Sequence, residues 1–130
     1  MKGSLILAEA ATVHPDGTTS MLRAGIDRVM SSSAPIHLRA CLVARIEGEA
    51  SERGRHDLEI NCINEDGKDQ LPTVKGQFDL PTTGGKQAIT LALQANLNTF
   101  GLYQFNILVD RVLLDSWNLR AEQLSEKGNA

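Results

Sequence analysis

The chain has 130 residues, a formal net charge of −3 and an apolar fraction of 42%. This length fits one domain with a core of its own, and the composition is too apolar for wholesale disorder. Because the net charge is negative and the lysines and arginines are scattered, we expect no nucleic-acid partner. No segment is long and apolar enough to span a bilayer, so we expect no membrane partner.

The N-terminus is predicted to be a strand and not a secretory leader. A basic residue, a short apolar run and an alanine-rich stretch resemble a leader, but the run Leu5 to Ala8 is too short for its apolar segment. We expect a strand from Ser4 to Val13, which ends at a turn indicated by Pro15 and Gly17. A cytoplasmic location follows as an expectation.

Further strand signals follow in chain order, separated by turn residues. A second strand is predicted from Thr18 to about Met30, in which Gly25 indicates a bulge or a bend. The clearest alternation of apolar and polar residues runs from His37 to Glu47. Later stretches also alternate with a period of two, which favours strands over helices. The remaining predicted strands are 57–64, 74–80, 87–97 and the two arms of a hairpin within 100–122.

About eight strands joined by short connections predict an all-β fold, an antiparallel β-sandwich. Each strand has one apolar face, and a second sheet is needed to cover it. No internal repeat, low-complexity segment or linker divides the chain. We therefore expect a single domain over residues 1–122 and a polar C-terminal tail over residues 123–130.

The two cysteines, Cys41 and Cys62, are predicted to be free thiols. On the strand 37–47 the alternating apolar residues share one face, and Cys41 lies on the opposite face. On the strand 57–64 Cys62 lies on the apolar face. If these strands pair as a hairpin, the thiols point to opposite faces of the sheet, too far apart to form a disulfide. Free thiols agree with a reducing compartment.

The only tryptophan, Trp117, lies on the second arm of the final hairpin, and the turn decides which way it points. A two-residue turn at Asp110 and Arg111 sets Trp117 opposite Gln104, on the outer face. Such a turn requires φ > 0 at both central residues, for which Arg111 is a poor choice. This register is therefore not the expected one.

A three-residue turn over 110–112 sets Trp117 opposite Phe105, on the apolar face. The same register places Asp115 opposite Ile107, so we expect a bulge or an edge position there. We favour this register because it keeps the aromatic side chains in the core. The predicted core residues of the hairpin are Tyr103, Phe105, Trp117 and Leu119.

Gly101 to Val109 follow a G-x-Y-x-F-x-I-x-V pattern. The pattern resembles the strand of immunoglobulin-like sandwiches that carries the tyrosine corner. The resemblance implies that the hydroxyl of Tyr103 bonds to an upstream backbone group. The spacing of cysteine and tryptophan typical of antibody domains is absent.

Four different short motifs are spread along most of the chain. They are Asp16-Gly17, Gly25-Ile26-Asp27-Arg28, Ile63-Asn64-Glu65-Asp66-Gly67 and Gly101 to Asp110. Together they resemble a family of small bacterial proteins without assigned function. One departure is Arg111, which stands where a glycine is expected. The motifs are turns and strands, so the resemblance implies a fold and no catalytic role.

No residue pattern indicates catalysis or a cofactor. The three histidines, His14, His37 and His56, lie at turns and strand ends, and no serine lies in a glycine-rich elbow. The glycines before Lys86 open a strand and not a helix, which argues against a phosphate site. We expect no catalytic residues and no cofactor.

One loop gathers oxygen ligands. Its oxygen-bearing side chains are Asn64, Glu65, Asp66 and Asp69. Calcium prefers such ligands, but Lys68 lies among them and the loop is shorter than an EF-hand loop. We expect a solvated hairpin turn and no metal site.

The strand 37–47 has an outer face too apolar for a solvated surface. Its outward positions are Arg39, Cys41, Val43 and Arg45, and Ile63 points outward on the strand predicted to pair with it. Two interpretations stay open: a loop covers this strip, or a protein binds it between the arginines.

The sequence therefore predicts a non-catalytic module that binds a protein partner or forms a homo-oligomer. One alternative is a structural or accessory component of a larger, phage-derived assembly. The other is an enzyme or small-ligand receptor whose site is built from dispersed loops.

Overall fold

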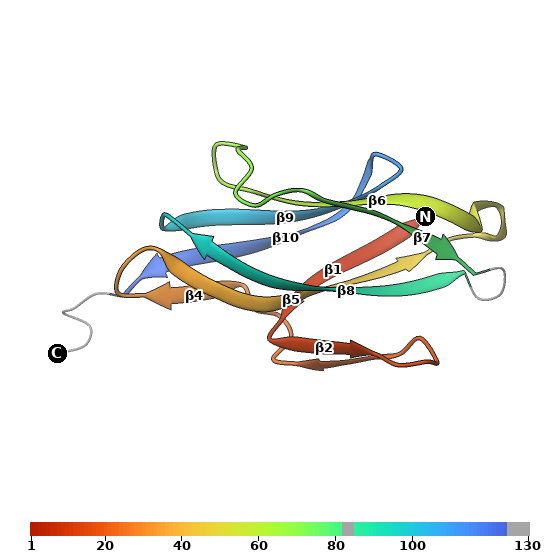
Figure 1. Ribbon diagram of the computed structural model, residues 1–130, viewed down its shortest axis with the longest axis horizontal. Helices are drawn as coiled ribbons and strands as arrows, with labels where there is room; N and C mark the ends of the chain where they lie inside the picture. Colours follow the sequence, from red (N-terminus) through yellow and green to blue (C-terminus); the bar gives the residue numbers. More distant parts are fainter. Residues whose placement is uncertain (82–84, 125–130) are drawn as a thin grey trace.

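The computed structural model describes residues 1–81 and 85–124. In these residues it is all-β apart from one 3-10 turn, with ten strands in two facing sheets and a two-stranded ribbon (Figure 1). The expected number of about eight strands is wrong, because each of the first two predicted strands is broken into two. The strands are β1 (Lys2–Ala8), β2 (Ala10–Val13), β3 (Thr19–Leu22), β4 (Arg28–Ser31), β5 (Ile36–Glu47), β6 (Gly54–Ile63), β7 (Val74–Leu80), β8 (Lys86–Leu97), β9 (Gly101–Val109) and β10 (Val112–Gln123).

Both breaks carry the chain from one layer to another. Between β1 and β2, the N–H of Glu9 donates to the carbonyl of Leu22 at 2.9 Å, and the β2–β3 ribbon begins. After β3 the chain turns at Gly25, whose φ of 94° suits glycine. The N–H groups of Gly25 and Ile26 both donate to the carbonyl of Leu7, at 2.8 and 3.0 Å. The bend expected at Gly25 is thus a crossover from the ribbon to β4.

The smaller sheet has the strand order β1-β5-β8, and the larger has the order β4-β10-β9-β6-β7. Among the described strands the pairs are antiparallel except β4 with β10, which is parallel, so the purely antiparallel expectation is wrong at that edge. Figure 1 shows β9 and β6 of the larger sheet above the smaller sheet, β4 at the level of β5, and the ribbon with β2 below both sheets. Buried apolar side chains of both sheets form one core cluster.

The predicted hairpin between the strands of the two cysteines is wrong. β5 belongs to the smaller sheet and β6 to the larger one, and their apolar faces meet across the core. Cys62 lies in that core, whereas Cys41 lies on the outer side of β5. Both thiols are free and buried. Desolvation in the core raises the pKa of Cys62 to about 12, so this thiol is not a nucleophile near neutral pH.

In the final hairpin the expected three-residue turn is wrong, whereas the expected pairing of Trp117 with Phe105 is confirmed. Asp110 and Arg111 form a two-residue turn with φ of 48° and 68°, and Val112 pairs with Val109. The register then shifts at a bulge between Leu113 and Asp115. A two-residue turn followed by a one-residue bulge gives the same pairing beyond the bulge as a three-residue turn.

Beyond the bulge Trp117 lies opposite Phe105, as predicted. Phe105 is buried and Trp117 is half-buried against the core. Asp115 lies opposite Ile107, and its Oδ2 accepts a hydrogen bond from the N–H of Leu5 at 2.7 Å. The carboxylate therefore joins β10 to β1 at one side of the fold. The buried residues of this hairpin include Tyr103, Phe105, Ile107, Val109, Leu119 and Ala121.

Candidate functional site

The residues of the predicted interface do not lie on one surface. Arg39, Cys41, Val43 and Arg45 are on the outer side of the smaller sheet, whereas Ile63 is on the larger sheet. Val43 is only 1% exposed and Cys41 only 7%, and the β2 strand of the ribbon contacts β5 and β8 (Figure 1). A segment of the chain thus covers the apolar middle of the strip. Arg39 and Arg45 stay exposed at its two ends.

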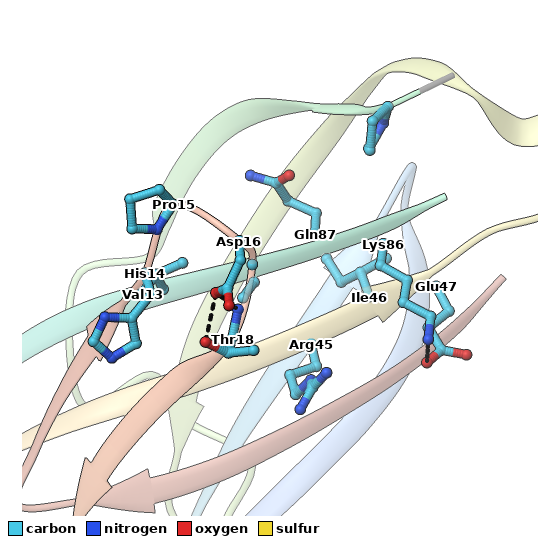
Figure 2. A pocket seen from close by; sticks show the side chains of 13 residues that line it. Val13, His14, Pro15, Asp16, Thr18, Arg45, Ile46, Glu47, Lys86 and Gln87 are labelled. Carbon is cyan, nitrogen blue, oxygen red and sulfur yellow. Dashed lines mark hydrogen bonds and ion pairs between the residues drawn. The ribbon is translucent and has the colours of Figure 1, made fainter. Parts of the chain in front are cut away.

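A polar groove of about 630 Å³ lies between the turn of the ribbon and the ends of β5 and β8 (Figure 2). In it Asp16 accepts hydrogen bonds from the hydroxyl and the N–H of Thr18, at 2.6 and 2.9 Å, which lowers the pKa of Asp16. The Nζ atom of Lys86 lies 3.7 Å from a carboxylate oxygen of Glu47. With Arg45 nearby, positive and negative groups are mixed, so the groove has no field of one sign to attract a charged ligand.

Two histidines make exposed contacts with polar side chains. His37 Nδ1 lies 2.5 Å from Asn96 Oδ1, and His14 Nε2 lies 2.6 Å from Ser20 Oγ. The second contact joins a base to a hydroxyl across the ribbon, and it cannot be read from the sequence because it depends on the ribbon's register. In the described part of the chain, no carboxylate is hydrogen-bonded to the His14 ring, as a nucleophile–base–acid set requires.

His56 joins the β5–β6 connection to the tip of the final hairpin. Its Nδ1 lies 2.6 Å from Asp110 Oδ2, and its Nε2 bonds to the carbonyl of Glu52. The other oxygen of Asp110 accepts from the N–H of Asp57 at 2.9 Å, and the His56 ring stacks on Phe78 with centroids 5.7 Å apart. Because both ring nitrogens face acceptors, the protonated ring fits best. The Asp110 carboxylate, followed by the Glu52 carbonyl, raises the pKa of His56, and His56 lowers the pKa of Asp110.

We expect the free energy of unfolding to fall as the pH rises through the raised pKa of His56. A raised folded pKa stabilises the fold fully below the unfolded value of 6.5, and this contribution disappears above the folded pKa. The lowered pKa of Asp110 acts at the other end: its contribution is present above the unfolded value of 3.8 and is lost as the pH falls through the folded pKa.

Urea unfolding at about pH 6 and about pH 8.5, on either side of an ordinary histidine titration, checks this expectation. The wild type should lose more stability over this interval than the variant His56→Gln, which keeps a polar side chain and does not titrate. Equal losses in the two proteins would contradict a stabilising His56–Asp110 pair.

The acidic loop after β6 uses its oxygens for hydrogen bonds within the chain. Asn64 Oδ1 accepts from the N–H groups of Asp66 and Lys68, at 2.9 and 3.0 Å. Glu65 Oε1 accepts from the N–H of Leu102 at 2.7 Å, which ties this loop to the start of β9. Within residues 1–81 and 85–124, no group of three or more His, Cys, Asp or Glu side chains is placed to hold a metal ion.

An apolar cleft of about 230 Å³ opens between the two sheets beside β8. Leu91 and Leu93 of β8 line one side, Leu71 and Val74 line the other, and Phe105 belongs to the lining from the core. Both leucines of β8 are only half-buried, although the residues opposite them on β5 are buried. The core is therefore incompletely covered along β8.

The same strand has an open main-chain edge. Among the described strands β8 pairs only with β5, in a register without a bulge from Lys86 to Leu97. The segment Gln87–Leu97 has no ionisable side chain, no proline and no glycine. Exposed edges are commonly protected by charges, prolines, bulges or short strands. The edge strand β7 carries Lys75 and Asp79, so β8 is the less protected of the two.

Residues 3–122 match a family whose description is "Family of unknown function (DUF6941)". The match includes all the motifs, which lie between Asp16 and Asp110, and agrees with the expected relation to a family without assigned function. None of the curated proteins matches the chain. In the part of the chain described by the structure, no helix is long and apolar enough to cross a membrane.

Proposed function

The chain belongs to the DUF6941 family, whose function is unknown. From its geometry we propose that it is a non-catalytic β-sandwich module that binds protein. The observation that carries the proposal is the uncharged edge of β8 beside the apolar cleft. An added strand would bond to this edge through its main chain and cover Leu91 and Leu93. The binding surface is thus the open side of the sandwich and not the strip around Val43, which the ribbon covers.

Two further features bear on the fold relation and on the cellular compartment proposed for this module. The Tyr103 hydroxyl donates to the carbonyl of Thr99 at 2.7 Å, as in a tyrosine corner, which supports the proposed relation to immunoglobulin-like sandwiches. The free thiols Cys41 and Cys62 support a reducing compartment such as the bacterial cytoplasm.

The cleft also favours a second candidate, a receptor for a small apolar molecule. Its volume of about 230 Å³ lies below the range of about 300–1,000 Å³ for small-molecule sites. The open main-chain edge of β8 lies beside the cleft. A small apolar molecule would leave the donors and acceptors of this edge unpaired. A polypeptide satisfies both features, so we prefer the protein partner.

A charge at the centre of the β8 edge tests the proposal. Ala92 is exposed on the outer side of β8, so Ala92→Lys should leave the fold intact and disfavour strand addition. Asn118→Lys is the matched control, because Asn118 is exposed on a strand of the other sheet. In affinity capture from the host, an identified partner should bind the wild type and the control and be lost with Ala92→Lys.

Hydrogen exchange on the reconstituted complex locates the contact. The partner should slow exchange of main-chain amides within Gln87–Leu97. Capture of the same proteins in equal amounts by Ala92→Lys, with no added protection in β8, contradicts binding at this edge.

A further inference from the structure

We infer that the strand that completes the β8 edge is β8 of a second copy of this chain, related by a two-fold axis. The inference rests on the proposed function and names its partner. It predicts a continuous sheet with the strand order β1-β5-β8 in one copy, followed by the reverse order in the other. This arrangement is isologous, because the same surface contributes from both copies.

The residues of β8 fit an antiparallel pairing with themselves. A two-fold axis perpendicular to the sheet keeps inward-facing residues opposite inward-facing ones. With the axis at Ala92, Leu91 of one copy lies opposite Leu93 of the other, and both sit at the mouth of the cleft. On the outer side Thr90 lies opposite Gln94, and Ala92 lies opposite itself. From Ile89 to Ala95 each cross-strand pair thus joins apolar to apolar or polar to polar side chains, and the mixed pairs, Gln87 with Leu97 and Ala88 with Asn96, lie at the two ends of the contact.

Charge does not oppose this pairing. The paired segment Gln87–Leu97 is free of ionisable side chains. The nearest charge on β8 is Lys86, at one end of the strand, and it already faces Glu47 at 3.7 Å. The edge of β7 is shorter, with seven residues against twelve in β8, and Gly76 near its centre has no side chain to pack, so β8 is the edge that a second copy fits better.

The contact is long enough to supply the number of hydrogen bonds found in a specific interface. Eleven paired residues, Gln87–Leu97, span about 37 Å of strand and form about ten main-chain hydrogen bonds across an antiparallel pair. About ten direct hydrogen bonds are typical of a specific protein interface. Closing the two clefts against each other also covers Leu91, Leu93 and Val74, of which Val74 is 39% exposed in the single chain.

Analytical ultracentrifugation of the purified full chain tests the inference. At about 100 µM, well above a micromolar dissociation constant, the wild type should sediment as a dimer. Ala92→Lys places two like charges opposite each other at the axis and should raise the dimer dissociation constant at least about tenfold. Asn118→Lys should match the wild type, and circular dichroism should show the same strand content in all three proteins.

A mixture of two variants makes the test specific for the axis. Ala92→Lys and Ala92→Glu should each be mainly monomeric alone, and their equimolar mixture should form a heterodimer because opposite charges then meet. If the mixture stays as monomeric as its components although each is folded, the proposed axis is wrong.

A wild type that is monomeric at this concentration overturns the second copy as occupant. Native mass spectrometry then shows whether another protein or a small apolar molecule occupies the edge instead. A dimer whose dissociation constant Ala92→Lys leaves unchanged overturns the β8 contact. If the chain does not dimerise but a different protein slows hydrogen exchange in β8, the proposed function still holds. If Ala92→Lys captures the same partners in the same amounts as the wild type, the proposed function itself is wrong.

Discussion

Replacing Phe105 with alanine should lower the free energy of unfolding by about 3–5 kcal/mol, the range for a large aromatic side chain removed from a core. Phe105 is 1% exposed and lies on β9 between two neighbours in the same sheet, Cys62 of β6 and Trp117 of β10. It also belongs to the lining of the apolar cleft. Its removal therefore enlarges a gap that the surrounding strands already leave partly open.

Urea unfolding of the variant measures this loss, and two substitutions on the same strand serve as controls. Phe105→Leu keeps much of the apolar volume and should cost less than about 2 kcal/mol. Gln104→Ala changes a side chain on the outer face and should stay within about 0.5 kcal/mol. A loss of less than about 1 kcal/mol in the free energy of unfolding of Phe105→Ala is typical of a surface substitution and would contradict the core position of Phe105.

Replacing Trp117 with alanine should cost about 3 kcal/mol, at the lower end of the range for a core aromatic because the ring is only half-buried. The indole also makes a polar contact: its Nε1–H donates to the carbonyl of Ile26 at 2.7 Å. The N–H of Ile26 in turn donates to the carbonyl of Leu7 at 3.0 Å. Trp117 thus helps to hold the crossover between β3 and β4 against β1 and β10.

The variant Trp117→Phe separates the hydrogen bond from the packing. It keeps an aromatic ring, leaves the Ile26 carbonyl without its donor and should cost about 1 kcal/mol. Because Trp117 is the only tryptophan, its emission in the wild type reports its surroundings. The emission should be blue-shifted relative to tryptophan in water and only partly accessible to quenchers. Solvent-like emission with full quenching contradicts the observed packing.

The amino-acid sequence determined where most strands lie. The strand β7 begins and ends as predicted, at Val74 and Leu80, because proline and glycine residues bound a short alternating run. β8 was predicted over 87–97 and begins one residue earlier. A period of two also identified which residues of β5 and β9 face the core, since alternation is a local property of an extended chain.

The tertiary structure decided which strands are neighbours. The period of β5 and β6 is the same whether two strands share hydrogen bonds or pack face to face, so the sequence could not separate the two arrangements. Val43 is buried because the ribbon covers it. The sequence of the ribbon does not indicate which surface of the fold it covers. At the final turn, Arg111 adopts φ > 0 because a two-residue hairpin turn requires it, and the bulge after Leu113 then restores the register of the paired strands.

The candidate site shows the same division. The uncharged composition of Gln87–Leu97 is plain in the sequence, but only the topology makes this strand an edge. The half-exposed leucines of β8 also depend on how far the larger sheet extends over the smaller one, which no single strand encodes. Local alternation and turn residues fix the elements and their apolar faces, whereas strand order, edges and clefts arise from contacts between segments far apart in the chain.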